Sequence, residues 1–181
     1  MNDYIDRLIR YSTIGVISIL SVCYFWFLID PSIIHFKQQP LFLFNHYFLA
    51  EYISFPGGIA EYLSMFLSQF LYSTILGSLI LMFLIFIICF LFYKLLLNYF
   101  SKKTSFYIQF VPGLILVHLH SHYAYDFRGD IIFLASIIAA IIYNKLFTIS
   151  LIKKVSLLLI TSFILLLLFG GTSLLLFSII I

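Results

Sequence analysis

The sequence predicts an all-α, polytopic membrane protein with about five transmembrane helices and further helices at the membrane surface. Of its 181 residues, 64% are hydrophobic and only 9% are charged, and 22 Phe and 13 Tyr are among them. A single soluble domain of this length could not bury so much apolar surface. Long apolar runs alternate with short polar segments, and the backbone can cross lipid only as helices or closed barrels. The net charge of +3 gives no support for nucleic acid as a partner.

A hydrocarbon core of about 30 Å requires about 20 helical residues. Five stretches qualify or nearly qualify, and together with the segment 30–72 they are predicted to form one membrane domain, 1–181. The stretches are residues 11–29, 73–96, 105–121, 131–147 and 155–181.

The first stretch follows Arg7 and Arg10 and is closed by Asp30-Pro31. It lacks a small-x-small cleavage site, so it is predicted to be an uncleaved anchor rather than a signal peptide.

The segment 30–72 is long for a connection and too aromatic for a solvated one. Residues 41–53 predict a short helix rich in Phe and Tyr. Pro56, Gly57 and Gly58 then predict a turn, because proline disfavours helix at the residue before it and glycine allows positive φ.

A second helix is expected from Ile59, with Glu61, Ser64 and Ser68 on one stripe and apolar side chains over much of the rest. This pattern predicts an amphipathic helix at the outer interface. Continued unbroken to Leu97, it would be about 58 Å long, nearly twice the apolar core, so a bend is expected near Tyr72.

The third stretch contains Pro112, which removes one intrahelical hydrogen bond and predicts a kink near Ile108. A short polar segment, 123–130, joins it to the fourth stretch as a tight hairpin. The fifth stretch runs through LLLFSIII to Ile181. We expect that the chain is the truncated form of something longer.

The positive-inside rule orients the predicted helices. With a cytoplasmic N-terminus, eight of the ten basic residues lie inside, namely Arg7, Arg10, Lys94, Lys102, Lys103, Lys145, Lys153 and Lys154. Lys37 and Arg128 lie outside. The sequence therefore predicts an inner (cytoplasmic) membrane location with the first loop, the five histidines and most carboxylates at the outer face.

Glu51 and Glu61 flank the Pro-Gly-Gly turn, and three interpretations of Glu61 are open. In the first turn of a helix it would be stabilised by the macrodipole. As a catalytic acid, base or cation ligand it would share a cavity with Glu51. It could also pair with Arg128 or Lys37.

The segment HLHSHYAYD places His118, His122 and Asp126 on one helical face, whereas His120 points elsewhere. Such spacing is compatible with a divalent metal or a proton relay. Interfacial histidines also commonly face water or bond to helix-end carbonyls, so both interpretations stay open. Arg128 is expected to pair with Asp126 or Asp130. The cofactor, if any, is unknown.

The stretch LFLFNHYFLAEYISFPGGIAEYLSMFLSQFLYSTILGSLILM, with its PGG, AEYL and QF elements, resembles an uncharacterised bacterial family of multi-pass membrane proteins known only as a domain of unknown function. The likeness extends more loosely through the later stretches, including Gly170-Gly171. The resemblance implies an N-terminal membrane portion of a longer protein and carries no established activity.

Three functions compete. A structural or assembly component of the bacterial envelope would use the interfacial helices to dock other membrane subunits, in addition to the lipid bilayer. A membrane-embedded transferase would act on a lipid-linked substrate at the outer face through a carboxylate of the first loop. A transporter would need charge in mid-membrane, which none of the five stretches carries.

Overall fold

The computed structural model describes residues 2–38, 41–145 and 151–181 and contains helices but no strand among them, which confirms the all-α class. The ten α-helices of this described part are α1 (Asn2–Tyr24), α2 (Pro31–Gln38), α3 (His46–Ile53), α4 (Gly58–Ser68), α5 (Thr74–Leu96), α6 (Lys102–Ile108), α7 (Phe110–Ser121), α8 (Arg128–Lys145), α9 (Leu151–Phe169) and α10 (Gly171–Ile180). A π-helical turn, η1 (Phe25–Ile29), continues α1, and a 3-10 turn, η2 (Gln69–Tyr72), follows α4.

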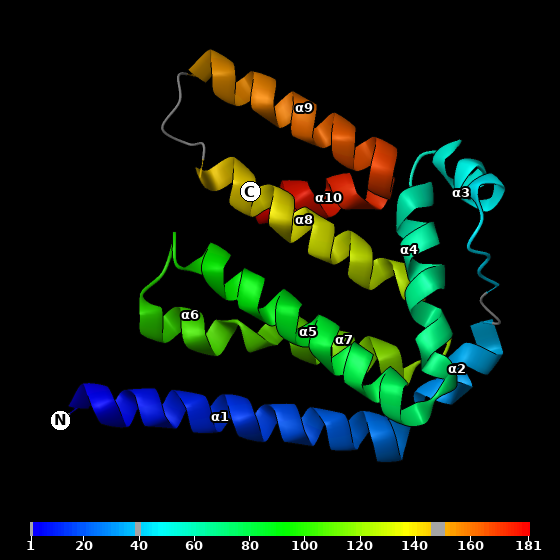
Figure 1. Cartoon of the computed structure of the whole chain (residues 1–181). Coiled ribbons are helices and arrows are strands. Elements are labelled where there is room, and N and C mark those ends of the chain that lie inside the picture. Colours follow the sequence, from blue (N-terminus) through cyan, green and yellow to red (C-terminus); the bar gives the residue numbers. More distant parts are fainter. Residues whose placement is uncertain (1, 39–40, 146–150) are drawn as a thin grey trace.

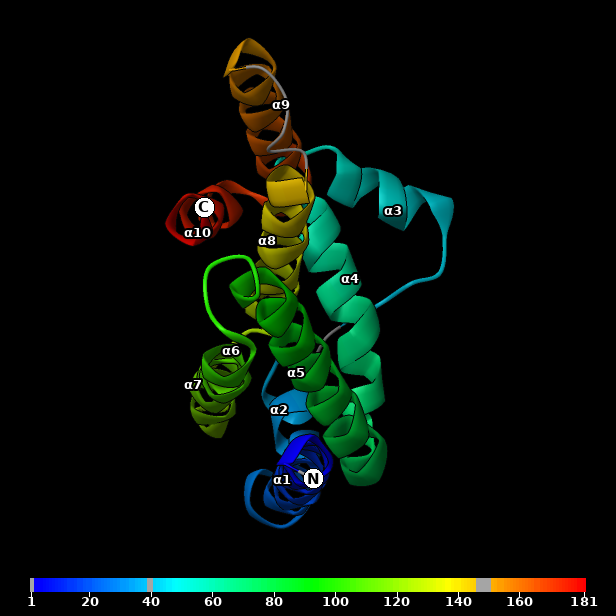
Figure 2. The ribbon, with the colours of Figure 1, turned by 90° about the vertical axis from the view of Figure 1, so that its left-hand side faces the viewer.

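The long helices run side by side, and α4 lies across one end of them (Figure 1). Viewed along the long helices, α9, α8, α5 and α1 form a row (Figure 2). The helices α6, α7 and α10 lie on one side of this row, and α3 and α4 lie on the other. This arrangement places the first loop at the end of the bundle where α7 finishes and α8 begins.

Three helices of the described residues are long and apolar enough to cross a membrane, over Tyr11–Ile29, Thr74–Leu96 and Ile152–Phe169. The third and fourth predicted membrane stretches, 105–121 and 131–147, are not among these three helices. The third is divided between α6 and α7, and α8 includes the charged residues Arg128, Asp130 and Lys145.

The division of the third stretch lies where proline chemistry predicts it. Helix α6 ends at Ile108, and α7 begins at Phe110. Pro112 has no N–H to donate to the carbonyl of Ile108, so the regular helical pattern is interrupted there.

The fifth stretch is not the single helix that we expected over 155–181. Helix α9 ends at Phe169, and Gly170 adopts φ 85° and ψ 177°, a conformation that only glycine adopts readily. The chain then reverses, so that α10 packs against α8 and α9 (Figure 1). The Gly170-Gly171 pair therefore forms the turn of a helical hairpin.

The bend expected near Tyr72 is found there. After η2, Ser73 is extended, with φ −94° and ψ 121°, and α5 begins at Thr74. Asp30, with φ 49°, accepts hydrogen bonds from the Ser32 hydroxyl at 2.7 Å and the Thr74 hydroxyl at 2.8 Å. The first of these bonds is the main reason that the pKa of Asp30 lies below its usual value. Asp30 thus ties the end of the first long helix to the start of α5.

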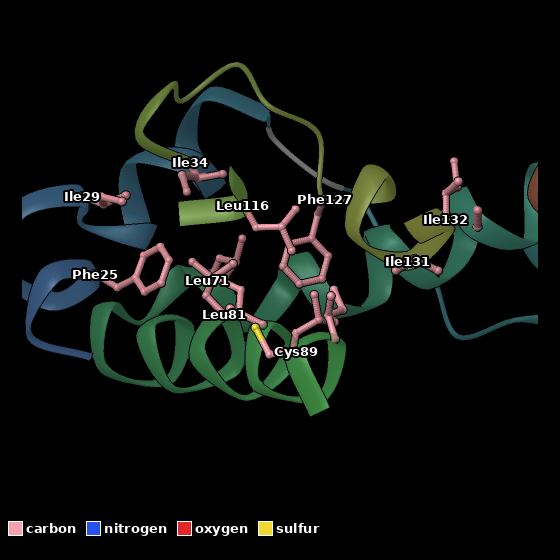
Figure 3. Packing of buried hydrophobic residues seen from close by; sticks show 14 of the residues in the cluster. Phe25, Ile29, Ile34, Leu71, Leu81, Cys89, Leu116, Phe127, Ile131 and Ile132 are labelled. Atoms are coloured by element: carbon pink, nitrogen blue, oxygen red, sulfur yellow. The ribbon is translucent and has the colours of Figure 1, made fainter. Parts of the chain in front are cut away.

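The largest hydrophobic cluster of the described residues joins η1, η2, α5 and α7. It lies at the end of the bundle that carries the first loop (Figure 3). Phe25, Leu71, Leu81 and Phe127 are fully buried in it, and Leu116 of α7 lies among them. Their burial fixes the α7–α8 connection, which carries most of the polar side chains discussed below.

Candidate functional site

The turn between α3 and α4 is built by local capping. Asn45 precedes α3, and its side chain accepts hydrogen bonds from the backbone N–H groups of Tyr47 and Phe48. Helix α3 therefore begins at His46, directly after this cap, rather than at Leu41. Helix α3 ends at Ile53, and Gly57 adopts φ 87° immediately before α4. The structure therefore places Pro56, Gly57 and Gly58 in a tight turn between two helices.

The polar stripe of α4 faces the protein and not water. Ser64 and Ser68 are buried, whereas Leu63, Phe66 and Phe70 are exposed. Helix α4 packs against α8 and α9, and its two serine side chains are among its buried residues. The helix consequently presents an apolar face outward.

Glu61 lies in the first turn of α4 and pairs with Arg128 at the start of α8, with 3.4 Å between Oε2 and Nη1. Both the macrodipole and the Arg128 interpretations of Glu61 thus describe its position. We expected Arg128 to pair with Asp126 or Asp130, but its guanidinium pairs with neither. Instead, its backbone N–H donates to the Asp126 carboxylate at 2.9 Å.

Glu51 is exposed, and the structure gives no direct contact between it and Glu61. The pKa of the nearby Tyr52 phenol is raised, first by burial and then by the negative charges of Glu61 and Glu51. A catalytic role for the two carboxylates stays a prediction.

The two glycine turns of the chain meet at Arg128. The backbone N–H of Gly57 donates to the carbonyl of Leu167 in α9 at 3.0 Å. A Cβ on Gly57 would lie 2.7 Å from Nη2 of Arg128, and one on Gly170 would lie 3.5 Å from the same atom. The guanidinium therefore packs directly on both turns, and a side chain at Gly57 would push it away.

A buried polar cluster that sequence reasoning missed lies beside this contact. His120 Nε2 and Asp130 Oδ2 are 2.7 Å apart, and both residues are almost fully buried. The Tyr125 hydroxyl donates to Asp130 Oδ1 at 3.2 Å. Burial and the neighbouring Asp130 raise the pKa of Tyr125, which keeps the phenol protonated as a donor. His120 Nδ1 has no hydrogen-bond partner.

The sequence contained one signal for this pair. Asp130 is a carboxylate at the start of an apolar helix, and such a group requires a partner when it is buried. His120 supplies this partner, although we expected it to point away from the helical face that carries His118, His122 and Asp126.

The structure does not gather the three predicted metal ligands into one group. The rings of His118 and His122 pack edge to face, 5.2 Å apart, while Asp126 lies beyond the end of α7 and accepts from Arg128. Within residues 2–38, 41–145 and 151–181, three or more His, Cys, Asp or Glu side chains do not gather in a metal-binding group. Metal binding at His118, His122 and Asp126 stays a prediction.

A cavity of about 820 Å³, here called the α7–α8–α10 cavity, opens beside the cluster. Its walls are mainly apolar, and its lining residues on α7 extend from Val111 to Leu119, or about 12 Å of helix. Polar side chains line it at the loop end of the bundle, namely Tyr125, Asp126, Arg128 and Thr172. A cavity of this size falls in the range that small ligands occupy.

The fold and the cluster define an all-helical protein with long apolar helices and a polar site at one end of them. The chain belongs to the Family of unknown function (DUF6057), whose model matches residues 7–181. No curated protein and no solved structure matches the chain. The family is one of unknown function and assigns no activity to the site.

Proposed function

We propose that the chain is a multi-pass protein of the inner membrane that binds a lipid molecule in the α7–α8–α10 cavity. The membrane setting is supported by the three apolar helices and by apolar side chains exposed along them, including Ile19, Phe83 and Phe163. Water would be a poor solvent for so much continuous apolar surface.

The orientation follows from charge. Lys94 in the last turn of α5 and Lys145 at the end of α8 lie at the end of the bundle remote from α4. Lys102 begins α6 near the same end (Figure 1). In the proposed topology this end is cytoplasmic, and α4 lies at the outer surface. Helices α6–α7 and α8 then complete about five crossings.

Single-cysteine labelling with a reagent that does not cross the membrane tests this orientation in a Cys23- and Cys89-free background. We expect labelling of Ser54→Cys and Ser121→Cys in intact cells, and labelling of Ser101→Cys only after the membrane is opened. The reverse pattern would contradict the topology while leaving the helical fold intact.

The cavity is the observation that carries lipid binding. Val111, Ile115 and Leu119 of α7 and Leu176 of α10 line it. A hydrocarbon chain bound there would bury these apolar side chains. The polar end lies at the same level as Glu61 and Arg128. A lipid-linked molecule held there would have its headgroup beside the first-loop carboxylate, which is the arrangement that a transferase requires.

A second candidate, an assembly component of the envelope, is favoured by the outward apolar face of α4. Leu63 and Phe66 of α4, and Phe70 of the following turn η2, are exposed outside the apolar spans. Other membrane subunits could pack on this face without any use of the cavity.

Ile115→Trp tests the proposal, because the larger side chain enters the cavity from α7. Leu114→Trp is the matched control, since Leu114 is an exposed neighbour that lines a different groove. We expect native mass spectrometry of the purified protein to show bound lipid in the wild type and in Leu114→Trp, and its loss in Ile115→Trp. An unchanged lipid complement in Ile115→Trp would overturn lipid binding here and leave the assembly function.

A further inference from the structure

The guanidinium of Arg128 has donors that the protein does not use. Its Nε is buried without a hydrogen-bond partner, and the Glu61 contact at 3.4 Å is long. Charge-assisted N–H···O bonds are usually about 2.7–2.9 Å. A buried donor without an acceptor is costly, so the arrangement favours an acceptor that arrives with a ligand.

The surroundings hold this donor group in place. Gly57 and Gly170 pack on the Nη2 side, and Glu61 lies at Nη1. Arg128 also lines the α7–α8–α10 cavity, so a ligand in the cavity reaches it without displacing the helices. Guanidinium groups present paired N–H donors that match two oxygens of a phosphate.

The other polar groups at this end define the rest of the headgroup. Tyr125 donates its hydroxyl proton to Asp130, so its oxygen is left to accept hydrogen bonds. Asp126 is an exposed carboxylate that also accepts. One cation beside two acceptors suits a phosphodiester with one negative charge and hydroxyl groups attached to it. Asp126 and Glu61 would repel a phosphate dianion more strongly than this monoanion.

We propose that the ligand of the cavity is a lipid phosphodiester with a hydroxyl-bearing headgroup. Its phosphate binds Arg128, its hydroxyls donate to Tyr125 and Asp126, and its hydrocarbon chains lie along α7 and α10. This inference rests on the proposed function, because it names the chemical class of lipid that the same cavity holds.

Binding of defined lipids to the detergent-purified protein tests the inference by native mass spectrometry. The probes are dioleoyl phosphatidylglycerol, dioleoyl phosphatidylcholine, which lacks headgroup hydroxyls, and dioleoylglycerol, which lacks the phosphate. Glycerophosphoglycerol supplies the phosphodiester headgroup without chains. We expect phosphatidylglycerol to bind at least about tenfold more tightly than each of the others, as expected for one additional well-formed polar contact.

Two variants separate ligand recognition from the internal ion pair. Arg128→Gln should weaken phosphatidylglycerol binding about 10- to 100-fold, as expected for loss of a hydrogen-bonded charge. Glu61→Gln removes the same ion pair but leaves the guanidinium free, so it should retain or strengthen binding. Lys103→Gln, at the start of α6, controls for charge alone.

Equal loss of binding in Arg128→Gln and Glu61→Gln would overturn the inference, because Arg128 would then act only through its pair with Glu61. Equal binding of phosphatidylglycerol and dioleoylglycerol, lost in Ile115→Trp, would overturn phosphate recognition while supporting a lipid cavity. Equal binding of phosphatidylcholine would contradict the role of the hydroxyls. If no bound lipid were lost in Ile115→Trp, lipid binding in the cavity would be overturned, and the proposed function with it.

Discussion

Asp130→Ala is expected to destabilise the folded protein by about 2–6 kcal/mol, because it removes the common partner of two hydrogen-bonding groups, each of which costs about 1–3 kcal/mol when it is buried and unsatisfied. Asp130 and His120 are both almost fully buried, and their nearest atoms are 2.7 Å apart. Without the carboxylate, His120 Nε2 and the Tyr125 hydroxyl both lose their hydrogen-bond partner in an apolar environment. Thermal unfolding in detergent should therefore begin at a markedly lower temperature.

Glu51→Ala is the control for this experiment, because it removes an exposed carboxylate and should change stability by less than about 1 kcal/mol. The double variant His120→Leu/Asp130→Leu replaces both hydrogen-bonding partners by apolar side chains and should recover part of the loss. Similar unfolding temperatures for Asp130→Ala and Glu51→Ala would show that the pair does not stabilise the fold.

Local chemistry in the sequence predicted much of the helical pattern. The proline at Pro112 predicted the break between α6 and α7, and the Pro-Gly-Gly sequence predicted the end of α3 before Gly57. These features depend on residues within a few positions of one another. A backbone donor is missing at Pro112, and the conformation at Gly57 is open to glycine, whatever the rest of the chain does.

The arrangement of the candidate site could not be predicted in the same way, because it is formed by contacts between residues that are far apart in the sequence. Glu61 and Arg128 are separated by 67 positions in the sequence, and several partners were open to each charge. The inward turn of Ser64 and Ser68 likewise follows from packing of α4 on α8, since an amphipathic pattern does not say which face meets protein. The hairpin at Gly170 was missed because a long apolar run hides a reversal when its only marker is two glycines.

The positions of the glycines explain why the first loop and the last hairpin act as one unit. Gly57 bonds to Leu167, and Arg128 packs on Gly57 and Gly170 while it pairs with Glu61. A shift of α4 would therefore move the guanidinium at the polar end of the cavity. The turn before α4 is the place where a small substitution should have the greatest effect on both stability and the site.

Gly58→Ala is expected to destabilise the protein by roughly 3 kcal/mol, at the upper end of the usual cost of overpacking. A Cβ at Gly58 would lie 1.7 Å from the carbonyl oxygen of Tyr52 and 2.6 Å from its carbonyl carbon. Both are backbone atoms, so no side-chain rotation relieves the clash. Helices α3 and α4 would have to separate, which should also weaken Arg128-dependent lipid binding.

Gly15→Ala provides the matched control, because a Cβ at Gly15 in α1 meets nothing within 4 Å. Alanine within a helix is favoured over glycine by about 0.5–1 kcal/mol, so this variant should unfold at the same or a higher temperature than the wild type. The two glycine variants add the same methyl group, and only their surroundings differ. If they had equal unfolding temperatures, α3 and α4 could not be packed as closely at Gly58 as the structure shows.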